Sequence, residues 1–280
     1  KTALENLYSK TKNKSIRLIR NIREKRTLKE NFTNKVIDYD GRWRTTYSVG
    51  GTDTGRLAGK KTVFRTGSSL MNIPRSPEEG EDDKESTFIR KTMRASEGFE
   101  LGEADKAQAE ARLVAWFAKD EAMKGIFKSG KDIHRWNASI IFKKPIEQIA
   151  PNERYFAKRI VHAFNYGLGL DHLRDMILEE FEIEMSRAEV TAIKNAYFAG
   201  CPAILHWQES IREMIRKENR LINPFGRIRW FFGRQGEDLY RKGFAHLPQS
   251  TCVDDIDTSI PRIDARLPEG ARLSLQVQDS

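Results

Sequence analysis

A long stretch of helical pattern, residues 107–222, limits the folds open to this chain of 280 amino acids. Apolar residues recur through it at helical spacing, and helix-breaking residues interrupt it at Gly130, Pro145, Pro151 and Gly167. This part of the chain is therefore expected to be an assembly of helices.

The sequence RYFAKRIVHAFNYG, residues 154–167, predicts an amphipathic helix with a polar stripe. Side chains four residues apart share one slowly turning face, because each step of four advances ~400° and climbs ~6 Å. The stripe consists of Arg154, Lys158, His162 and Tyr166. The apolar face, roughly 200° round the helix, consists of Phe156, Ile160 and Phe164. The stripe is either a set of solvated cations above a packed face or a surface that binds an anion. Asn152 is the expected N-cap of this helix and Gly167 its C′ residue.

The net charge of the chain indicates which partners it can bind. The 49 Lys and Arg against 40 Asp and Glu give a formal charge of +9, which favours a polyanion such as nucleic acid. An acidic membrane surface would also attract it, but no apolar run approaches the ~20 residues of a membrane span, and no signal-peptide core follows Lys1.

At 39% hydrophobic residues the chain is expected to fold, as one large domain or two lobes. Cys201 and Cys252 show neither metal-cluster nor disulfide spacing, so a cytoplasmic location is expected.

The residues before the helical stretch differ from it in character. Residues 1–35 are basic and helical in pattern, which fits a solvated helix with one packed edge or a groove for a phosphate backbone. The apolar residues of that segment are Leu18, Ile19, Ile22 and Leu28. Residues 39–59 indicate strands and turns, and residues 74–88 form a polar, acidic loop. The helix that opens the long stretch is expected to pack through Leu113, Trp116 and Phe117.

Two aspartates are candidates for a metal site. The tail ARLSLQVQDS, residues 271–280, alternates as a strand does and places Asp279 on its apolar side. A carboxylate there is costly unless it is paired or binds a metal, although a strand that simply ends in water explains it equally. Asp105 follows a short β-prone run, at the point where a strand end projects a carboxylate into a cleft. Two such aspartates are what two-metal phosphoryl transfer requires, and hard oxygen ligands suit two Mg²⁺ ions.

With metals at those carboxylates, the polar stripe gains a role. Arg154 and Lys158, ~6 Å apart along the helix, could neutralise a polyphosphate leaving group. A helix that presents cations first and rings later can hold phosphates at one end and a base at the other. The spacing makes this interpretation possible without selecting it.

Short motifs then place the chain beside a known family. Over roughly residues 40–280 it resembles the family A DNA polymerases, the bacterial DNA polymerase I type, with the motifs in that family's order. They are TGRL (54–57), NIP (72–74), DKAQAEAR (105–112), DIH (132–134), RYFAKRIVHAFNYG (154–167), FGRIR (225–229), QST (249–251) and LQVQDS (275–280). The resemblance implies a template-directed DNA polymerase core, in which a primer 3′-hydroxyl attacks the α-phosphate of a deoxynucleoside triphosphate.

The resemblance also implies a role for each site residue. Asp105 and Asp279 would hold two Mg²⁺ ions, and Lys158 is a candidate proton donor to pyrophosphate. The residues that would bind the incoming nucleotide are His134, Arg154, Lys158, His162, Tyr166 and Glu110. Among them Glu110 matches the steric gate that blocks a ribose 2′-hydroxyl, and Tyr166 would lie beside the templating base. The residues that would contact primer-template DNA are Arg56, Asn72, Arg112, Gln249 and Gln278.

The fold implied is α+β, a right-hand polymerase architecture with an antiparallel-sheet palm, all-helical fingers and most of the thumb absent. Its expected parts are the end of a thumb (1–38), the first part of the palm (39–118), the fingers (119–245) and a truncated second part of the palm (246–280). A fragment is one explanation of the missing parts. A split polymerase with a complementary polypeptide is another.

Three positions depart from the family pattern. His162 stands where Phe or Tyr is usual, Gln278 replaces a His and Ser280 replaces a Glu. A divergent phage or viral enzyme explains these changes, and so does a weakened enzyme. The alternative functions are therefore a catalytically weakened or inactive nucleic-acid-binding protein on a polymerase fold, and a two-metal nuclease. A nuclease, however, has no need of the cationic stripe.

Overall fold

The computed structural model describes residues 4, 7, 11, 13–33, 35–74 and 88–277, which fall into two compact units. The first unit takes Lys1–Gly51, Leu57–Pro77 and Asp83–Gly102, and the second takes Thr52–Arg56, Glu78–Asp82 and Glu103–Ser280. The short segment Thr52–Arg56 thus belongs to the second unit, although both of its neighbours in the chain belong to the first.

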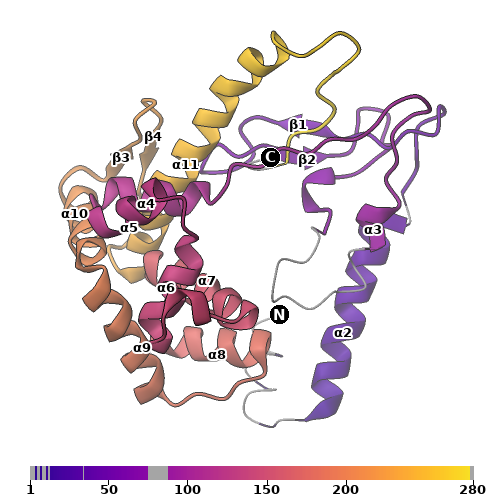
Figure 1. Ribbon diagram of the computed structural model, residues 1–280. Coiled ribbons are helices and arrows are strands. Elements are labelled where there is room, and N and C mark those ends of the chain that lie inside the picture. Colours follow the sequence, from indigo (N-terminus) through magenta and orange to yellow (C-terminus); the bar gives the residue numbers. More distant parts are fainter. Residues whose placement is uncertain are drawn as a thin grey trace. The chain divides into compact units, whose positions relative to one another are not determined.

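A basic helix opens the described part of the first unit, α2 (Lys14–Leu28), and continues into a π-helical turn, η1 (Lys29–Thr33) (Figure 1). Helical structure is as predicted here, and three of the apolar residues of this segment are exposed rather than packed along one edge: Leu18, Ile19 and Ile22. The buried apolar side chains are Ile16 and Phe32, near the two ends of this segment. The middle of α2 is therefore a charged, solvated helix surface.

A short antiparallel hairpin follows, as the pattern of residues 39–59 predicts. Its strands are β1 (Thr46–Ser48) and β2 (Ala58–Lys60), with Tyr47 opposite Gly59. The first unit also contains η2 (Leu70–Asn72) and α3 (Phe88–Lys91). Most of the predicted acidic loop lies outside the described residues.

Arg44 anchors the chain just before this hairpin. Its guanidinium lies 2.5 Å from a carboxylate oxygen of Asp38 and 2.6 Å from one of Asp40. The hydrogen bonds from Arg44 lower the pKa of the Asp40 carboxyl to about 2. The Arg44 carbonyl in turn leaves no room beside Gly67, where a Cβ would lie 1.9 Å from the carbonyl oxygen and where φ is +67°. Only glycine fits this crossing of the chain.

Helices make up most of the second unit (Figure 1). They are α4 (Ala109–Phe117), α5 (Glu121–Lys128), α6 (Ile133–Phe142), η4 (Ile146–Gln148), α7 (Pro151–Asn165), α8 (Leu170–Phe181), α9 (Arg187–Gly200) and α10 (Pro202–Glu218). The prediction of helices over residues 107–222 is confirmed as far as Glu218, whereas its last three residues, 220–222, form a strand. An antiparallel hairpin, β3 (Arg220–Ile222) and β4 (Ile228–Trp230), then leads to the long helix α11 (Glu237–Asp264).

The predicted amphipathic helix is α7, and its apolar face lies in the core of this unit. Phe156, Ile160 and Phe164 are all buried, as the sequence predicts. Gly167 follows the helix with φ +72°, the left-handed conformation expected at C′. The N-cap is Ala150 rather than Asn152, because Pro151 takes the first helical position, which suits its fixed φ.

The core extends from α7 to three later helices. Its largest fully buried side chains include Tyr197 of α9, Ile211 and Ile215 of α10 and Phe244 of α11. The expected packing of α4 is only partly correct. Trp116 is exposed, and Val114 and Ala115 fill the core in its place.

Two predicted strands are wrong. Residues 101–106 and 271–277 are irregular, so Asp105 does not stand at a strand end. Alternating or β-prone residues favour a strand only where a neighbouring strand completes the hydrogen bonds, and among the described residues neither segment pairs with a strand. The described fold is mostly helical α+β with two small antiparallel sheets. None of its helices is both long enough and apolar enough to cross a membrane.

Replacing Gly67 with alanine tests the crossing beside Arg44. Gly67→Ala is expected to lower the free energy of unfolding by more than about 2 kcal/mol, because it adds a collision with a backbone carbonyl to an unfavourable φ. Gly41→Ala is the matched control, because Gly41 has φ +74° but nothing within 4 Å of its would-be Cβ, and about 1 kcal/mol is expected. Denaturant unfolding of both variants measures the difference. Equal losses would contradict the close approach.

Candidate functional site

A carboxylate on α4, that of Glu110, lies between two other segments of the second unit. It accepts a hydrogen bond of 2.6 Å from the Tyr166 hydroxyl and pairs with the Arg56 guanidinium through its other oxygen. Tyr166 is the C-cap of α7, and Arg56 ends the segment Thr52–Arg56. Three residues that the sequence assigns to nucleotide or template binding are thus brought together.

His162 extends this cluster along α7. Its ring meets the Tyr166 ring edge to face, with centroids 4.5 Å apart and planes at 82°. Desolvation lowers the pKa of the His162 imidazole. The negative charge of Glu110 raises this pKa, and the positive charges of Arg159 and Lys158 lower it further. Burial and the charge of Glu110 raise the pKa of Tyr166 well above its ordinary value. The two shifts act in opposite directions, one on an imidazole that is exposed at the helix surface and one on a half-buried phenol.

The start of the stripe is tied to the neighbouring helix α6. Arg154 donates from Nε to Asp132 Oδ2 at 2.9 Å, and Asp132 Oδ1 accepts from the backbone N–H groups of His134 and Arg135 at 2.7 and 3.0 Å. Burial opposes ionisation of Asp132, but the hydrogen bonds from Arg135 and Arg154 outweigh it and lower its pKa. Asp132 thus caps α6 and orients Arg154 at the same time.

The remaining nucleotide-binding candidates lie on these two helices. Lys158 is half-buried on α7, between the Arg154 and His162 turns, and His134 is half-buried in the first turn of α6. The stripe predicted from the sequence is therefore one continuous surface of α7, with ionic contacts at its start and aromatic contacts at its end.

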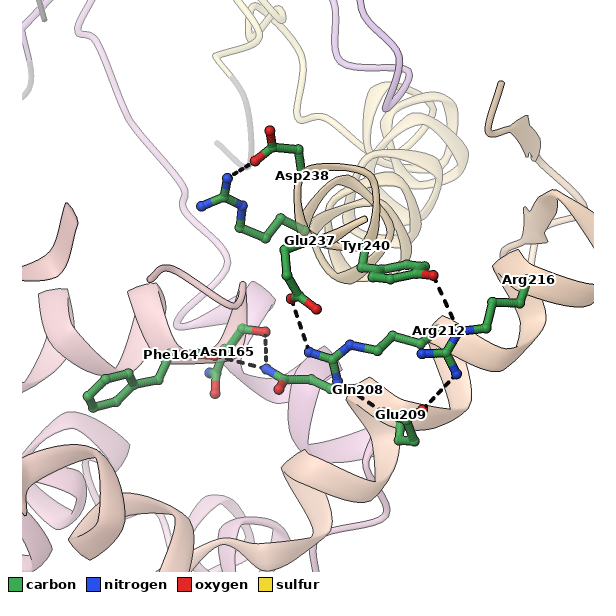
Figure 2. Close-up of polar contacts among 10 residues, drawn as sticks. Phe164, Asn165, Gln208, Glu209, Arg212, Arg216, Glu237, Asp238 and Tyr240 are labelled. Atoms are coloured by element: carbon green, nitrogen blue, oxygen red, sulfur yellow. Dashed lines mark hydrogen bonds and ion pairs between the residues drawn. The ribbon is translucent and has the colours of Figure 1, made fainter. Parts of the chain in front are cut away.

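A buried amide holds the end of α7, and the sequence analysis missed it. Figure 2 shows the side chain of Gln208, on α10, donating to the carbonyl oxygens of Phe164 and Asn165 at 2.9 and 3.0 Å. The hydroxyl of Tyr197 donates to the Asn165 side chain at 2.7 Å. Gln208 lies one helical turn after Ile204. A polar residue within an apolar stripe of a helix was therefore the sequence signal that could have indicated a buried, hydrogen-bonded amide.

Further contacts join α10 to α11. Arg212 lies 3.3 Å from a carboxylate oxygen of Glu237, and Arg216 donates to the Tyr240 hydroxyl at 3.3 Å (Figure 2). The Arg212 guanidinium also lies 5.0 Å from the centre of the Phe244 ring. These contacts fix the two helices that support the end of α7.

A second buried network, also missed, holds the β3–β4 hairpin against α11. Asp254 accepts from Asn223 Nδ2 at 2.6 Å and from Arg227 Nη2 at 2.5 Å, and Asn223 also donates to the Ser250 hydroxyl at 3.1 Å. Burial would raise the pKa of Asp254, but the hydrogen bonds from Arg227 and Asn223 hold it below its ordinary value. The motifs FGRIR and QST supply two of these four residues, Arg227 and Ser250.

This network reaches the segment that carries Arg56. A Cβ on Gly55 would lie 2.5 Å from Arg227 Cζ, so the backbone of Gly55 packs directly on the guanidinium. Asp53 forms an ion pair of 2.6 Å with Arg229 of β4. The hairpin therefore positions Thr52–Arg56, and with it the Arg56 contact to Glu110.

Other predicted residues are not part of this cluster. Arg112 donates to the Ala107 carbonyl at 3.0 Å with its guanidinium over the Phe127 ring, and Gln249 is half-buried on α11. Asn72 is exposed in the first unit, at the end of η2. Gln278 and Asp279 lie outside the described residues, as does Ser280.

The first of the two predicted metal ligands, Asp105, lies just before α4. The Asp105 side chain is exposed, and its carboxylate oxygens are hard ligands. The next residue, Lys106, pairs with Asp255 of α11. The second predicted ligand lies outside the described residues, and those that are described contain no group of three or more side chains able to hold a metal ion. Of the two predicted carboxylates, Asp105 is therefore exposed to solvent, and its oxygens are of the kind that Mg²⁺ prefers.

Known proteins resemble the chain over nearly its whole length. The profile of DNA polymerase family A matches residues 1–280. DNA polymerase I of Treponema pallidum is 28% identical over 273 residues, covering 94% of this chain and 26% of the relative. The thermostable DNA polymerase I of Thermus aquaticus is 30% identical over 268 residues, covering 92% of this chain and 30% of the relative. The chain thus spans about a quarter to a third of the length of these relatives.

A solved structure shares the fold. The polymerase domain of Pol1 from M. smegmatis, in complex with DNA primer-template and dNTP, aligns with a TM-score of 0.76 at 25% sequence identity. The alignment covers 99% of this chain and 48% of that chain.

His246 makes the stability of the second unit sensitive to acid. It is fully buried on α11, its ring nitrogens have no hydrogen-bond partner among the described residues, and burial with the charges of Arg229 and Arg227 lowers its pKa to about 4. Because the unfolded chain binds this proton near pH 6.5, the contribution to stability is complete above that pH and is lost as the pH falls toward 4.

We expect His246→Phe to remove this loss. The free energy of unfolding of the parent should fall relative to that of the variant by up to ~3 kcal/mol between pH 7 and pH 4. Denaturant unfolding at each pH measures it, with His206→Phe, an exposed histidine of α10, as the control. A constant difference between parent and His246→Phe would contradict a buried neutral imidazole.

Proposed function

The chain belongs to DNA polymerase family A, and we propose that it forms the core of a template-directed DNA polymerase that adds deoxynucleotides to a primer 3′ end. The observation that carries the proposal is the stripe of α7, whose cations lead to a ring cluster fixed by Glu110 and Arg56. The relative from M. smegmatis holds primer-template DNA and a dNTP, which supports DNA and nucleotides as the partners of this chain.

The cationic half of the stripe would bind the triphosphate. Arg154 is pre-oriented by Asp132, and Lys158 follows one turn later at ~6 Å. Guanidinium and ammonium groups suit phosphate oxygens, so both would neutralise the charge that grows on the pyrophosphate as it leaves. Lys158 would also give it a proton, and His134 would add a contact from α6.

The ring half of the stripe would enclose the sugar and base. Glu110 is held by Tyr166 and Arg56, so its carboxylate has little freedom to move aside for a ribose 2′-hydroxyl. His162 would lie against the sugar and Tyr166 beside the templating base. The His162 ring is exposed on this face of α7, where it can pack on a nucleotide.

Primer-template DNA would be the second substrate. Base pairing would read the sequence while the protein holds backbone and shape. The contacts proposed from the family motifs are Arg56, Asn72, Arg112, Gln249 and Gln278. The parts proposed are a thumb end (1–38), palm (39–118), fingers (119–245) and further palm (246–280).

A divalent metal site would be formed by Asp105 with Asp279. Carboxylate oxygens suit Mg²⁺, and when bound the ions would polarise the reacting phosphate and the primer hydroxyl. The exposed position of Asp105 fits a ligand that must reach a substrate. Two ions are proposed, from the mechanism of the family.

A second candidate function is a nucleic-acid-binding protein with weak or no catalysis. The observation that favours it is the replacement of the usual His and Glu by Gln278 and Ser280 on either side of Asp279. It predicts DNA binding without extension.

Primer extension tests the proposal. The full chain, and the longest natural form that contains it, are mixed with a labelled primer-template, Mg²⁺ and the four deoxynucleotides. Extension is expected to fall at least 100-fold in Asp105→Asn, because a metal ligand is lost. A folded, DNA-binding parent of the longest form that extends nothing would overturn the polymerase proposal and favour the second candidate.

The identity of residue 162 should set discrimination at the 3′ position of the sugar. A tyrosine in place of His162 adds a hydroxyl that can substitute for the missing 3′-hydroxyl of a dideoxynucleotide. His162→Tyr is therefore expected to raise dideoxynucleotide incorporation relative to deoxynucleotide incorporation by about fivefold, the worth of one hydrogen bond. Single-nucleotide incorporation assays measure this ratio. An unchanged ratio would place His162 away from the sugar.

A further inference from the structure

One face of the β3–β4 hairpin is apolar and exposed, and the proposed nucleotide site does not use it. In the hairpin register Arg220 pairs with Trp230 and Ile222 with Ile228, so these residues share a face, and Phe232 continues it two residues after Trp230. We call this set the hairpin face. Its apolar members are all exposed, and Phe232 most of all, at 81%.

The opposite side of the hairpin is held firmly. Leu221 and Phe231 are buried, and Arg229 lies over the Phe231 ring at 5.1 Å while it pairs with Asp53. Asn223 accepts from the backbone N–H groups of Phe225 and Arg227, which fixes the turn. The hairpin face is therefore a rigid surface, and its exposure is a fixed feature of the fold.

The rings of the hairpin face have the geometry of a stacking platform. Trp230 and Phe232 lie with their centroids 6.1 Å apart and their planes only 9° from parallel. The Arg220 guanidinium covers Trp230 at 5.5 Å from the ring centre. Arg220 is otherwise paired with Glu218 through one exposed contact of 3.3 Å, and a contact of this kind exchanges easily for another anion.

We propose that the hairpin face binds single-stranded DNA, with bases stacking on Phe232 and Trp230 and a phosphate bound by Arg220. Parallel exposed rings beside a guanidinium are complementary to bases joined by phosphates, and stacking accepts any base. The charge of +9 on the chain favours the same partner. The proposal rests on the proposed function for its source of single strand, the unpaired template beyond the primer.

Binding of a labelled 12-nucleotide oligo(dT), followed by fluorescence anisotropy without nucleotides or primer, tests the proposal. Phe232→Ser, Trp230→Ala and Arg220→Gln are each expected to weaken binding at least about fivefold. Phe64→Ser is the matched control, because Phe64 is a phenylalanine with 83% exposure in the first unit, and less than a twofold change is expected. Affinity for a blunt 12-base-pair duplex should change less than twofold in every variant.

Two results would overturn the assignment. One is that Phe232→Ser, Trp230→Ala and Arg220→Gln change the affinity for oligo(dT) no more than Phe64→Ser does. The other is a concentration-dependent dimer, seen by sedimentation without DNA and abolished by Phe232→Ser, which would make a second copy of the chain the occupant. Because the assay needs no nucleotide addition, a failure of primer extension would not change its outcome, and a negative binding result would leave the polymerase proposal standing.

Discussion

The Glu110 carboxylate is the contact on which the proposed site depends. It accepts from Tyr166 at the end of α7 and pairs with Arg56 from a segment far away in the sequence. The side chains of Arg56 and Glu110 are only 26% and 20% exposed, so the pair is better shielded than a surface ion pair. Loss of the carboxylate would leave the half-buried phenol hydroxyl of Tyr166 without this acceptor, a cost of about 1 kcal/mol. The same carboxylate therefore stabilises the site and shapes it.

Two further networks bring these three groups together. Gln208 holds the carbonyl oxygens at the end of α7, which fixes the direction of the last turn. Asp254 holds Arg227, and the backbone of Gly55 rests on that guanidinium. In each network the polar side chains hydrogen-bond to one another or to the backbone, which makes the local structure rigid. Each network holds a residue next to the Glu110 cluster rather than a member of the cluster. Gln208 and Asp254 would thus position the site without contacting substrate.

The helices and the polar stripe could be predicted from the sequence, because the 3.6-residue periodicity of α7 is a local property and Gly167 marks its end. The stripe's contacts could not, since Arg154 meets Asp132 and Tyr166 meets Glu110 only through tertiary packing. The predicted strands failed for the same reason: alternation is local, whereas a strand needs a partner. Asp132 stood within a motif that the sequence analysis quoted, but its function as a cap was visible only in the structure.

We propose that the α7 stripe, and not merely a basic helix, binds a nucleotide. Arg154 and Arg159 offer a matched pair on that helix, since Arg154 pairs with Asp132 and Arg159 with Glu180, but only Arg154 belongs to the stripe. The measurement is the equilibrium affinity of the full chain for a deoxynucleoside triphosphate with Mg²⁺, by calorimetry. Binding by the stripe predicts at least a tenfold weaker affinity in Arg154→Gln and less than a twofold change in Arg159→Gln. Equal effects of the two substitutions would contradict it.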